Sequence, residues 1–138
     1  MTVVVDANVA VYWTVEAPLS EKAVKVLRLE KSIIAPDLII AEVTNALYMQ
    51  VKDRLDKVER AMDGLEFLPR WFAELVPSHS LRNRAMGLAL ELEHPAYDCF
   101  YLALALSRQV TLISADGRFL RKAAAKGYRK LIAHLEDW

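Results

Sequence analysis

Four acidic side chains of this 138-residue chain stand in apolar stretches where a charge is unexpected. Asp6 directly follows three valines, Glu42 interrupts the run LIIAEV, and Asp98 is the one charge between residues 95 and 106. Asp116 comes soon after the apolar run TLIS. An ionised carboxylate in such a setting costs free energy unless it is paired or binds a cation. Together, the four acids are candidates for a cation site.

The order of apolar runs predicts how the four acids come together. Asp6 and Asp116 each follow a predicted strand, at 3–5 and 111–114, so they lie at the carboxyl ends of those strands. Glu42 is in the second turn of the helix that follows the strand at 33–35. Asp98 is near the start of a helix that leads to the strand beginning at Thr111. In a parallel sheet all four positions fall on the carboxyl edge, where ligands bind.

Each acid has an ordinary interpretation when it is taken alone. Asp6 could end a strand, Glu42 could face solvent, Asp98 could favour a helix N-terminus, and Asp116 could form a turn. Four acids on one edge would repel one another and raise one another's pKa, which a hard divalent cation relieves. Oxygen ligands favour Mg²⁺ or Mn²⁺. The three scattered histidines argue against zinc.

The elements that must position these acids alternate along the chain. Short apolar runs predict buried strands at 3–5, 33–35, 75–76, 111–114 and 131–133. Helical spacing predicts helices capped by Ser20, by Asp37 (to about residue 52) and by Asp56, and others at 81–92, 95–107 and 118–126. Strands that are separated by helices indicate a parallel sheet covered on both faces. The predicted class is therefore α/β, a three-layer α/β/α sandwich.

Composition limits the possible functions. The length predicts one domain over residues 1–138, and 54% hydrophobic residues fit a globular chain. One cysteine excludes an internal disulfide framework, and four scattered glycines exclude glycine-rich phosphate loops. The sequence shows neither a membrane span nor a basic leader, so we expect a cytoplasmic protein.

The neutral net charge hides a basic C-terminal stretch. Residues 108–130 hold seven basic residues and one acidic residue, a local balance of +6. This stretch has two interpretations, a solvated helix face and a contact surface for a polyanion. Arg118, Arg121 and Lys122, which follow Asp116, are the candidates for contact with a nucleic acid backbone.

Four segments of the chain resemble the motifs of the PIN-domain nucleases, most closely the VapC toxins of type II toxin–antitoxin systems. They are VVDANV at the start, PDLIIAEVTNAL around Glu42, YDCFYLALA around Asp98 and LISADGRF around Asp116. The resemblance covers nearly the whole chain. Two departures are that Ser114 stands where threonine is commoner, and that Gly117 and Arg118 follow where some relatives carry another acid.

The resemblance implies a ribonuclease that hydrolyses phosphodiester bonds with Mg²⁺ or Mn²⁺. Asp6, Asp98 and Asp116 are then expected to bind the metal, and Glu42 to bind a second ion or orient the attacking water. Asn8, Ser114 and Asn45 would position these groups. The implied partners are RNA, a second copy of the chain, and a VapB-like antitoxin that covers the acidic pocket.

Other functions can be judged against the same residues. A PIN nuclease without an antitoxin and a non-catalytic PIN-like RNA-binding module share the fold, although the second should lack one or more of the acids. A haloacid-dehalogenase-like phosphatase needs a second aspartate where Asn8 stands. A receiver domain needs an acceptor aspartate in mid-chain, and that pattern does not fit.

Overall fold

A five-stranded parallel sheet forms the centre of the protein in a computed structural model, which describes residues 1–29 and 32–138. The strand order is β3-β2-β1-β4-β5, so the first strand of the chain is the middle strand. In register, Val4 of β1 pairs with Ile34 of β2 and with Leu112 of β4. The strands are β1 (Thr2–Val5), β2 (Ser32–Pro36), β3 (Glu74–Val76), β4 (Thr111–Ser114) and β5 (Ile132–His134).

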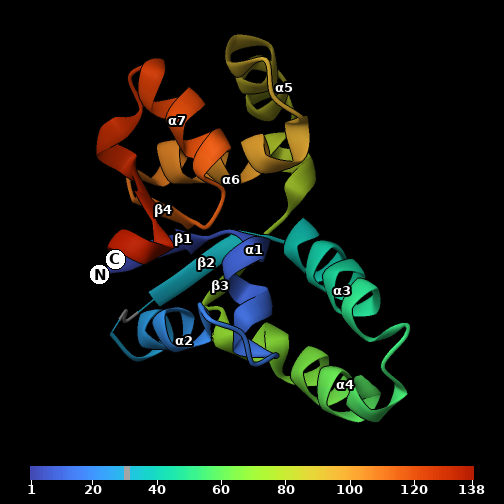
Figure 1. Ribbon diagram of the computed structural model, residues 1–138. Helices are drawn as coiled ribbons and strands as arrows, with labels where there is room; N and C mark the ends of the chain where they lie inside the picture. The colour runs from blue at the N-terminus through green and yellow to red at the C-terminus, as the bar shows by residue number, and fades with distance from the viewer. Residues whose placement is uncertain (30–31) are drawn as a thin grey trace.

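Helices cover both faces of the sheet (Figure 1). One layer holds α1 (Ala7–Ala10), α2 (Ser20–Leu29), α3 (Leu38–Val51) and α4 (Val58–Phe67). The other holds α5 (Arg82–Leu92), α6 (Ala96–Arg108) and α7 (Gly117–Ala125). The central strand β1 and most of α6 are buried among apolar side chains, as continuous apolar runs require. The predicted α/β class with a parallel sheet between two helical layers is confirmed.

Local hydrogen bonds move some predicted helix starts. Ser20 lies inside α2, where its hydroxyl accepts from the Ala17 N–H and donates to the Val15 carbonyl. Asp37 precedes α3, but its carboxylate accepts from the backbone N–H and hydroxyl of Ser78 and does not cap the helix. The prediction that these side chains cap was therefore wrong, because each has a better partner outside the helix. The helix expected from Asp56 begins at Val58, after a 3₁₀ turn.

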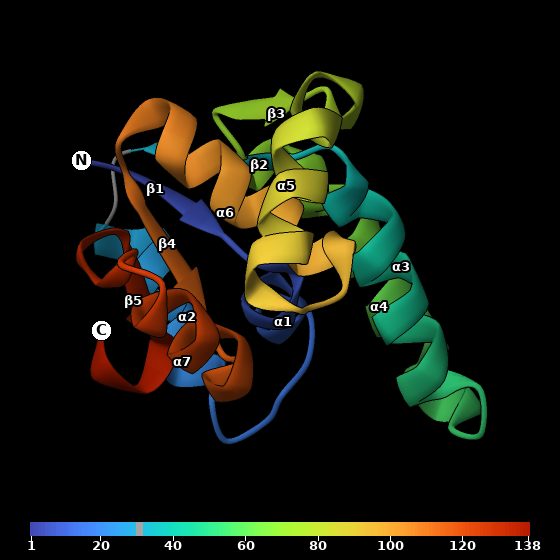
Figure 2. The ribbon, with the colours of Figure 1, turned by 90° about the horizontal axis from the view of Figure 1, so that it is seen from above.

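The pair α3 and α4 extends past the sheet edge as a narrow arm (Figure 2). Its outer surface exposes large apolar side chains, each at least half accessible: Tyr48, Met49, Leu55, Met62 and Phe67. A hollow of about 330 Å³ lies between the two helices, with Leu47 and Leu65 in its lining. Among the described residues, no helix is long and apolar enough to cross a membrane.

Candidate metal centre

Asp6 is held at the end of β1 by a network that joins the two central strands. Its side chain is 2% exposed, and its Oδ2 accepts from the Ser114 hydroxyl at 2.9 Å and the Asn8 amide at 3.3 Å. Asn8 in turn accepts from the Ala115 N–H at 2.9 Å. The backbone N–H of Asp6 donates to Ile113 at 3.0 Å. We call Asp6, Asn8 and Ser114 the strand-end network.

Burial and neighbouring charges oppose ionisation of Asp6. Desolvation, followed by the charges of Asp98 and Glu42, raises the pKa of Asp6 to about 8, although the Ser114 hydrogen bond works against this rise. Across residues 1–29 and 32–138, no lysine or arginine forms an ion pair with Asp6. Asp6 therefore lies in the field of two other acids without a basic partner.

Asp116 connects this network to α7. Its carboxylate caps the helix by accepting from the Phe119 N–H at 3.1 Å, and its own N–H donates to the Ser114 hydroxyl at 3.1 Å. One residue after β4 the sequence places an aspartate and a glycine, so the chain turns there and starts a helix that the aspartate carboxylate caps. The cap fixes Asp116 at the sheet edge.

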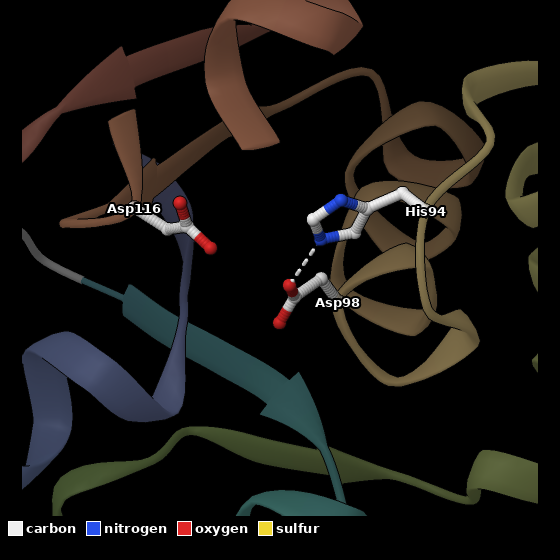
Figure 3. Close-up of side chains that lie close together, drawn as sticks. All are labelled: His94, Asp98 and Asp116. Atoms are coloured by element: carbon white, nitrogen blue, oxygen red, sulfur yellow. Dashed lines mark hydrogen bonds and ion pairs between the residues drawn. The ribbon is translucent and has the colours of Figure 1, made fainter. Parts of the chain in front are cut away.

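Asp98 and Asp116 lie close to His94, which is one of the three histidines of the chain (Figure 3). One possible ligand atom from each of the three lies within 4.8 Å of the others. His94 Nε2 is 2.6 Å from Asp98 Oδ2, and Lys122 Nζ is 3.3 Å from His94 Nδ1. We call Lys122, His94 and Asp98 the helix-end chain, since they come from α7, from the turn before α6 and from α6.

Glu42 reaches the same edge from α3. The hydroxyl of Tyr101, a fully buried residue of α6, donates to its Oε1 at 2.7 Å. Burial, and less strongly the charge of Asp98, raises the pKa of Glu42 above its ordinary value, although the Tyr101 bond works against the rise. Burial, followed by the negative charges of Asp6 and Glu42, raises the pKa of the Tyr101 phenol far above its ordinary value, so this hydroxyl stays a donor.

The remaining predicted residues differ in their contacts. Asn8 and Ser114 bond to Asp6, whereas Asn45 bonds to none of the four acids within the described part of the chain. Asn45 is exposed and lines a hollow of about 250 Å³ with Glu42 and Tyr97. Arg118 and Arg121 are exposed on α7 beside Asp116, but the Lys122 ammonium donates to the Glu93 carbonyl at 2.9 Å and lies against His94.

Sequence reasoning missed two residues at this edge, His94 and Tyr101. His94 precedes Asp98 by four residues, the spacing that brings side chains together over one helical turn, and this was an available signal. The argument from three scattered histidines concerned zinc alone, and it did not predict that His94 lies beside Asp98 and Asp116. Tyr101 had no such signal, because its partner Glu42 is 59 residues away in sequence.

The donor set fits a divalent cation. Its four carboxylates include one, Asp6, that is buried without a basic partner among the described residues. Bound positive charge would offset both the burial and the repulsion that raise the pKa of Asp6. Carboxylate oxygens with at most one imidazole suit Mg²⁺ or Mn²⁺ better than a thiolate-binding metal.

Comparison with known proteins agrees with the fold. The solved structure of PAE2754 from Pyrobaculum aerophilum superposes with a TM-score of 0.71 at 24% identity, over 99% of this chain and 90% of that one. At this identity the likeness concerns the fold alone. No curated protein matches the chain. The family model described as PIN domain matches residues 3–125, and the chain therefore belongs to the PIN domain family.

Proposed function

We propose that the protein is an endoribonuclease that hydrolyses phosphodiester bonds in single-stranded RNA with Mg²⁺ or Mn²⁺. PIN domains are generally metal-dependent nucleases, which supports the reaction class. The observation that carries the proposal is the buried Asp6, which has two further acids in its field and no basic partner among the described residues. Ionising this buried carboxyl costs free energy, and a bound cation would offset that cost.

Asp6, Asp98 and Asp116 are the residues that would hold the cation. When bound, a divalent cation supplies Lewis-acid activation of water and stabilises negative charge on phosphate oxygens. Ser114 and Asn8 both bond to Oδ2 of Asp6, so their role is to fix the orientation of this carboxylate. Because both of these bonds go to Oδ2, Oδ1 is the oxygen that we assign to the cation.

Glu42 is proposed to orient the attacking water. Tyr101 binds one of its oxygens, which fixes the carboxylate plane, and the hollow beside Glu42 opens toward solvent. The raised pKa of Glu42 makes it a better proton acceptor than an ordinary glutamate. Tyr101 thus acts through Glu42 as a positioning residue.

RNA contacts are proposed on both sides of the acids. Arg118 and Arg121 present charge to the phosphate backbone from α7. Tyr97, which directly precedes Asp98, is 68% exposed and lines the hollow that contains Glu42. Single-stranded RNA is commonly held by bases that stack on aromatic rings, so Tyr97 is suited to hold an unpaired base.

Replacing Tyr97 by alanine should raise KM for RNA, whereas the same change at Tyr48, which is exposed on the α3–α4 arm, should not.

The test of the activity is Asp6→Asn. This variant keeps the side-chain shape but removes the negative charge, so cleavage of a labelled single-stranded RNA in Mg²⁺ or Mn²⁺ should fall by more than the roughly 10–100-fold typical for a group that only orients a ligand. Asp63→Asn, on the exposed side of α4, is the matched control. Cleavage by Asp6→Asn at the wild-type rate would contradict the proposal, and RNA binding by the wild type without cleavage would favour a non-catalytic module.

The biological role that we propose is that of a VapC-type toxin held by a VapB-like antitoxin, with the toxin acting as a homodimer. The α3–α4 arm supports the proposal of a protein partner, since monomeric soluble proteins rarely expose so many large apolar side chains together. Expression alone should arrest growth, and co-expression of the neighbouring gene should relieve the arrest. Growth unaffected by an active enzyme would favour a PIN nuclease without an antitoxin.

A further inference from the structure

His94 is nearly buried, although it lies beside the acids at the edge of the sheet. Its side chain is 8% exposed, and its ring lies 4.9 Å from the ring of Phe119, a fully buried residue of α7. Both ring nitrogens have a polar neighbour, Lys122 at Nδ1 and Asp98 at Nε2. The ring therefore has little freedom to turn, and the direction of each nitrogen is set by the fold.

The chemistry of Lys122 assigns the ring proton. An ammonium group is only a donor, so the nitrogen it approaches, Nδ1, has to be the acceptor. A neutral imidazole with an accepting Nδ1 carries its proton on Nε2. That proton points at Asp98 Oδ2, 2.6 Å away. Lys122 is itself anchored, because it also donates to the Glu93 carbonyl at 2.9 Å.

We propose that His94 is a positioning residue of the metal centre: held by Lys122 in the Nε2–H form, it donates to Asp98 and leaves the other carboxylate oxygen to the cation. The inference rests on the proposed function, since it assigns a role toward the proposed cation. His94 is thus an outer partner of the ligand Asp98, although it lies close enough to be mistaken for a ligand itself.

Two consequences separate this role from direct ligation. A donor that orients a carboxylate can be replaced by another N–H group at the same place, and the amide nitrogen of glutamine reaches a position similar to Nε2. A direct imidazole ligand cannot be replaced in this way, and it would put a nitrogen in the coordination sphere of the metal. His94→Gln and His94→Phe are therefore the informative pair, since phenylalanine keeps a ring against Phe119 and removes both nitrogens.

The experiment measures Mn²⁺ binding by calorimetry and by electron paramagnetic resonance on the full chain. His94→Phe should bind Mn²⁺ about 10–100-fold more weakly than the wild type, and His94→Gln should recover most of that loss. His79→Phe, a change at an exposed histidine away from the acids, should bind like the wild type. In the wild type, the resonance of bound Mn²⁺ should carry no coupling to a directly bound histidine nitrogen.

A second measurement does not depend on the folding of any His94 variant. In the metal-free wild type, nitrogen–proton correlation of ¹⁵N-labelled histidine should find the His94 proton on Nε2. In Lys122→Met the two tautomers should mix, whereas Lys126→Met, which changes an exposed lysine near the end of α7, should leave the spectrum unchanged.

Failure of the inference differs from failure of the proposed function. Absence of Mn²⁺ binding by the wild type would overturn the metal centre itself. Wild-type affinity in His94→Phe, or a proton on Nδ1 in the wild type, would overturn the role of His94 and leave the nuclease proposal standing. A strong nitrogen coupling together with loss of affinity in both variants would make His94 a ligand and would also overturn it.

Discussion

The two halves of the acidic edge are built in different ways. The strand-end network joins β1 to β4, whose register pairs Val5 with Ile113, so Asp6 and Ser114 are fixed by the sheet ladder. The helix-end chain instead joins α7, α6 and the turn between α5 and α6, and Asp98 in it is 25% exposed. The sheet therefore fixes one carboxylate in place, whereas the other depends on hydrogen bonds between side chains for its orientation.

The pH dependence of stability tests the buried half and should give the largest effect. Between about pH 4 and 8, folded metal-free protein keeps a proton on Asp6 that the unfolded chain has lost, because the folded pKa is about 8 and the ordinary value is 3.8. The stability that this proton contributes is fully present below about pH 4, and it is lost as the pH rises through 8. Thermal unfolding in EDTA should therefore show a Tm that falls by several degrees from pH 5 to pH 8.

Asp6→Asn separates this effect from the titration of other groups. The amide has no charge to lose, so the Tm of this variant should fall less over the same pH range, and it should exceed the wild-type Tm at pH 8. Asp63→Asn should keep the wild-type slope. An unchanged slope in Asp6→Asn would mean that burial of Asp6 does not set the pH dependence.

Removal of the Ser114 hydroxyl should break the strand-end network. Ser114 is fully buried, and its hydroxyl donates to Asp6 while it accepts from the Asp116 N–H. Ser114→Ala leaves both partners short of a bond, and the free energy of unfolding should fall by about 1–3 kcal/mol. Urea denaturation measures this loss, with Ser80→Ala at an exposed position as the control. A loss as small as that of the control would show that the network adds little to the fold.

Tyr101→Phe should give a smaller effect. The variant removes the hydroxyl that donates to Glu42 at 2.7 Å and leaves the ring in the core. The free energy of unfolding should fall by about 1 kcal/mol, and kcat should fall because Glu42 is no longer held in one orientation. Steady-state kinetics should show the change in kcat with little change in KM. A change in KM alone would contradict the positioning role of Tyr101.

The smallest predicted effect is a gain of stability on the helix-end side. Glu93, the residue before His94, ends α5 in the left-handed conformation at φ 51°. Glycine adopts this conformation without the clash that a side chain brings, so Glu93→Gly should raise the free energy of unfolding by up to about 1 kcal/mol. Lys122 donates to the backbone carbonyl of Glu93, which glycine keeps, so Mn²⁺ affinity should not change. A loss of stability would show that the Glu93 side chain has a role of its own.

The sequence predicted the strand half of the site better than the helix half. Asp6 and Asp116 follow apolar runs that are short enough to be strands, and parallel topology places both at one edge. The bond between Ser114 and Asp6 could not be predicted, because it depends on the register of β1 against β4. His94 and Lys122 meet because the turn before α6 lies against α7, which no local pattern describes.

The central position of β1 has a consequence for how the protein is made. The strand that precedes Asp6 leaves the ribosome well before β4, because Ser114, the hydroxyl partner of Asp6, is 108 residues further along. The Asp116 and Lys122 groups follow later still. A growing polypeptide on the ribosome therefore carries the first acid of the centre long before it carries the last, and the centre can assemble only after Lys122 has been translated.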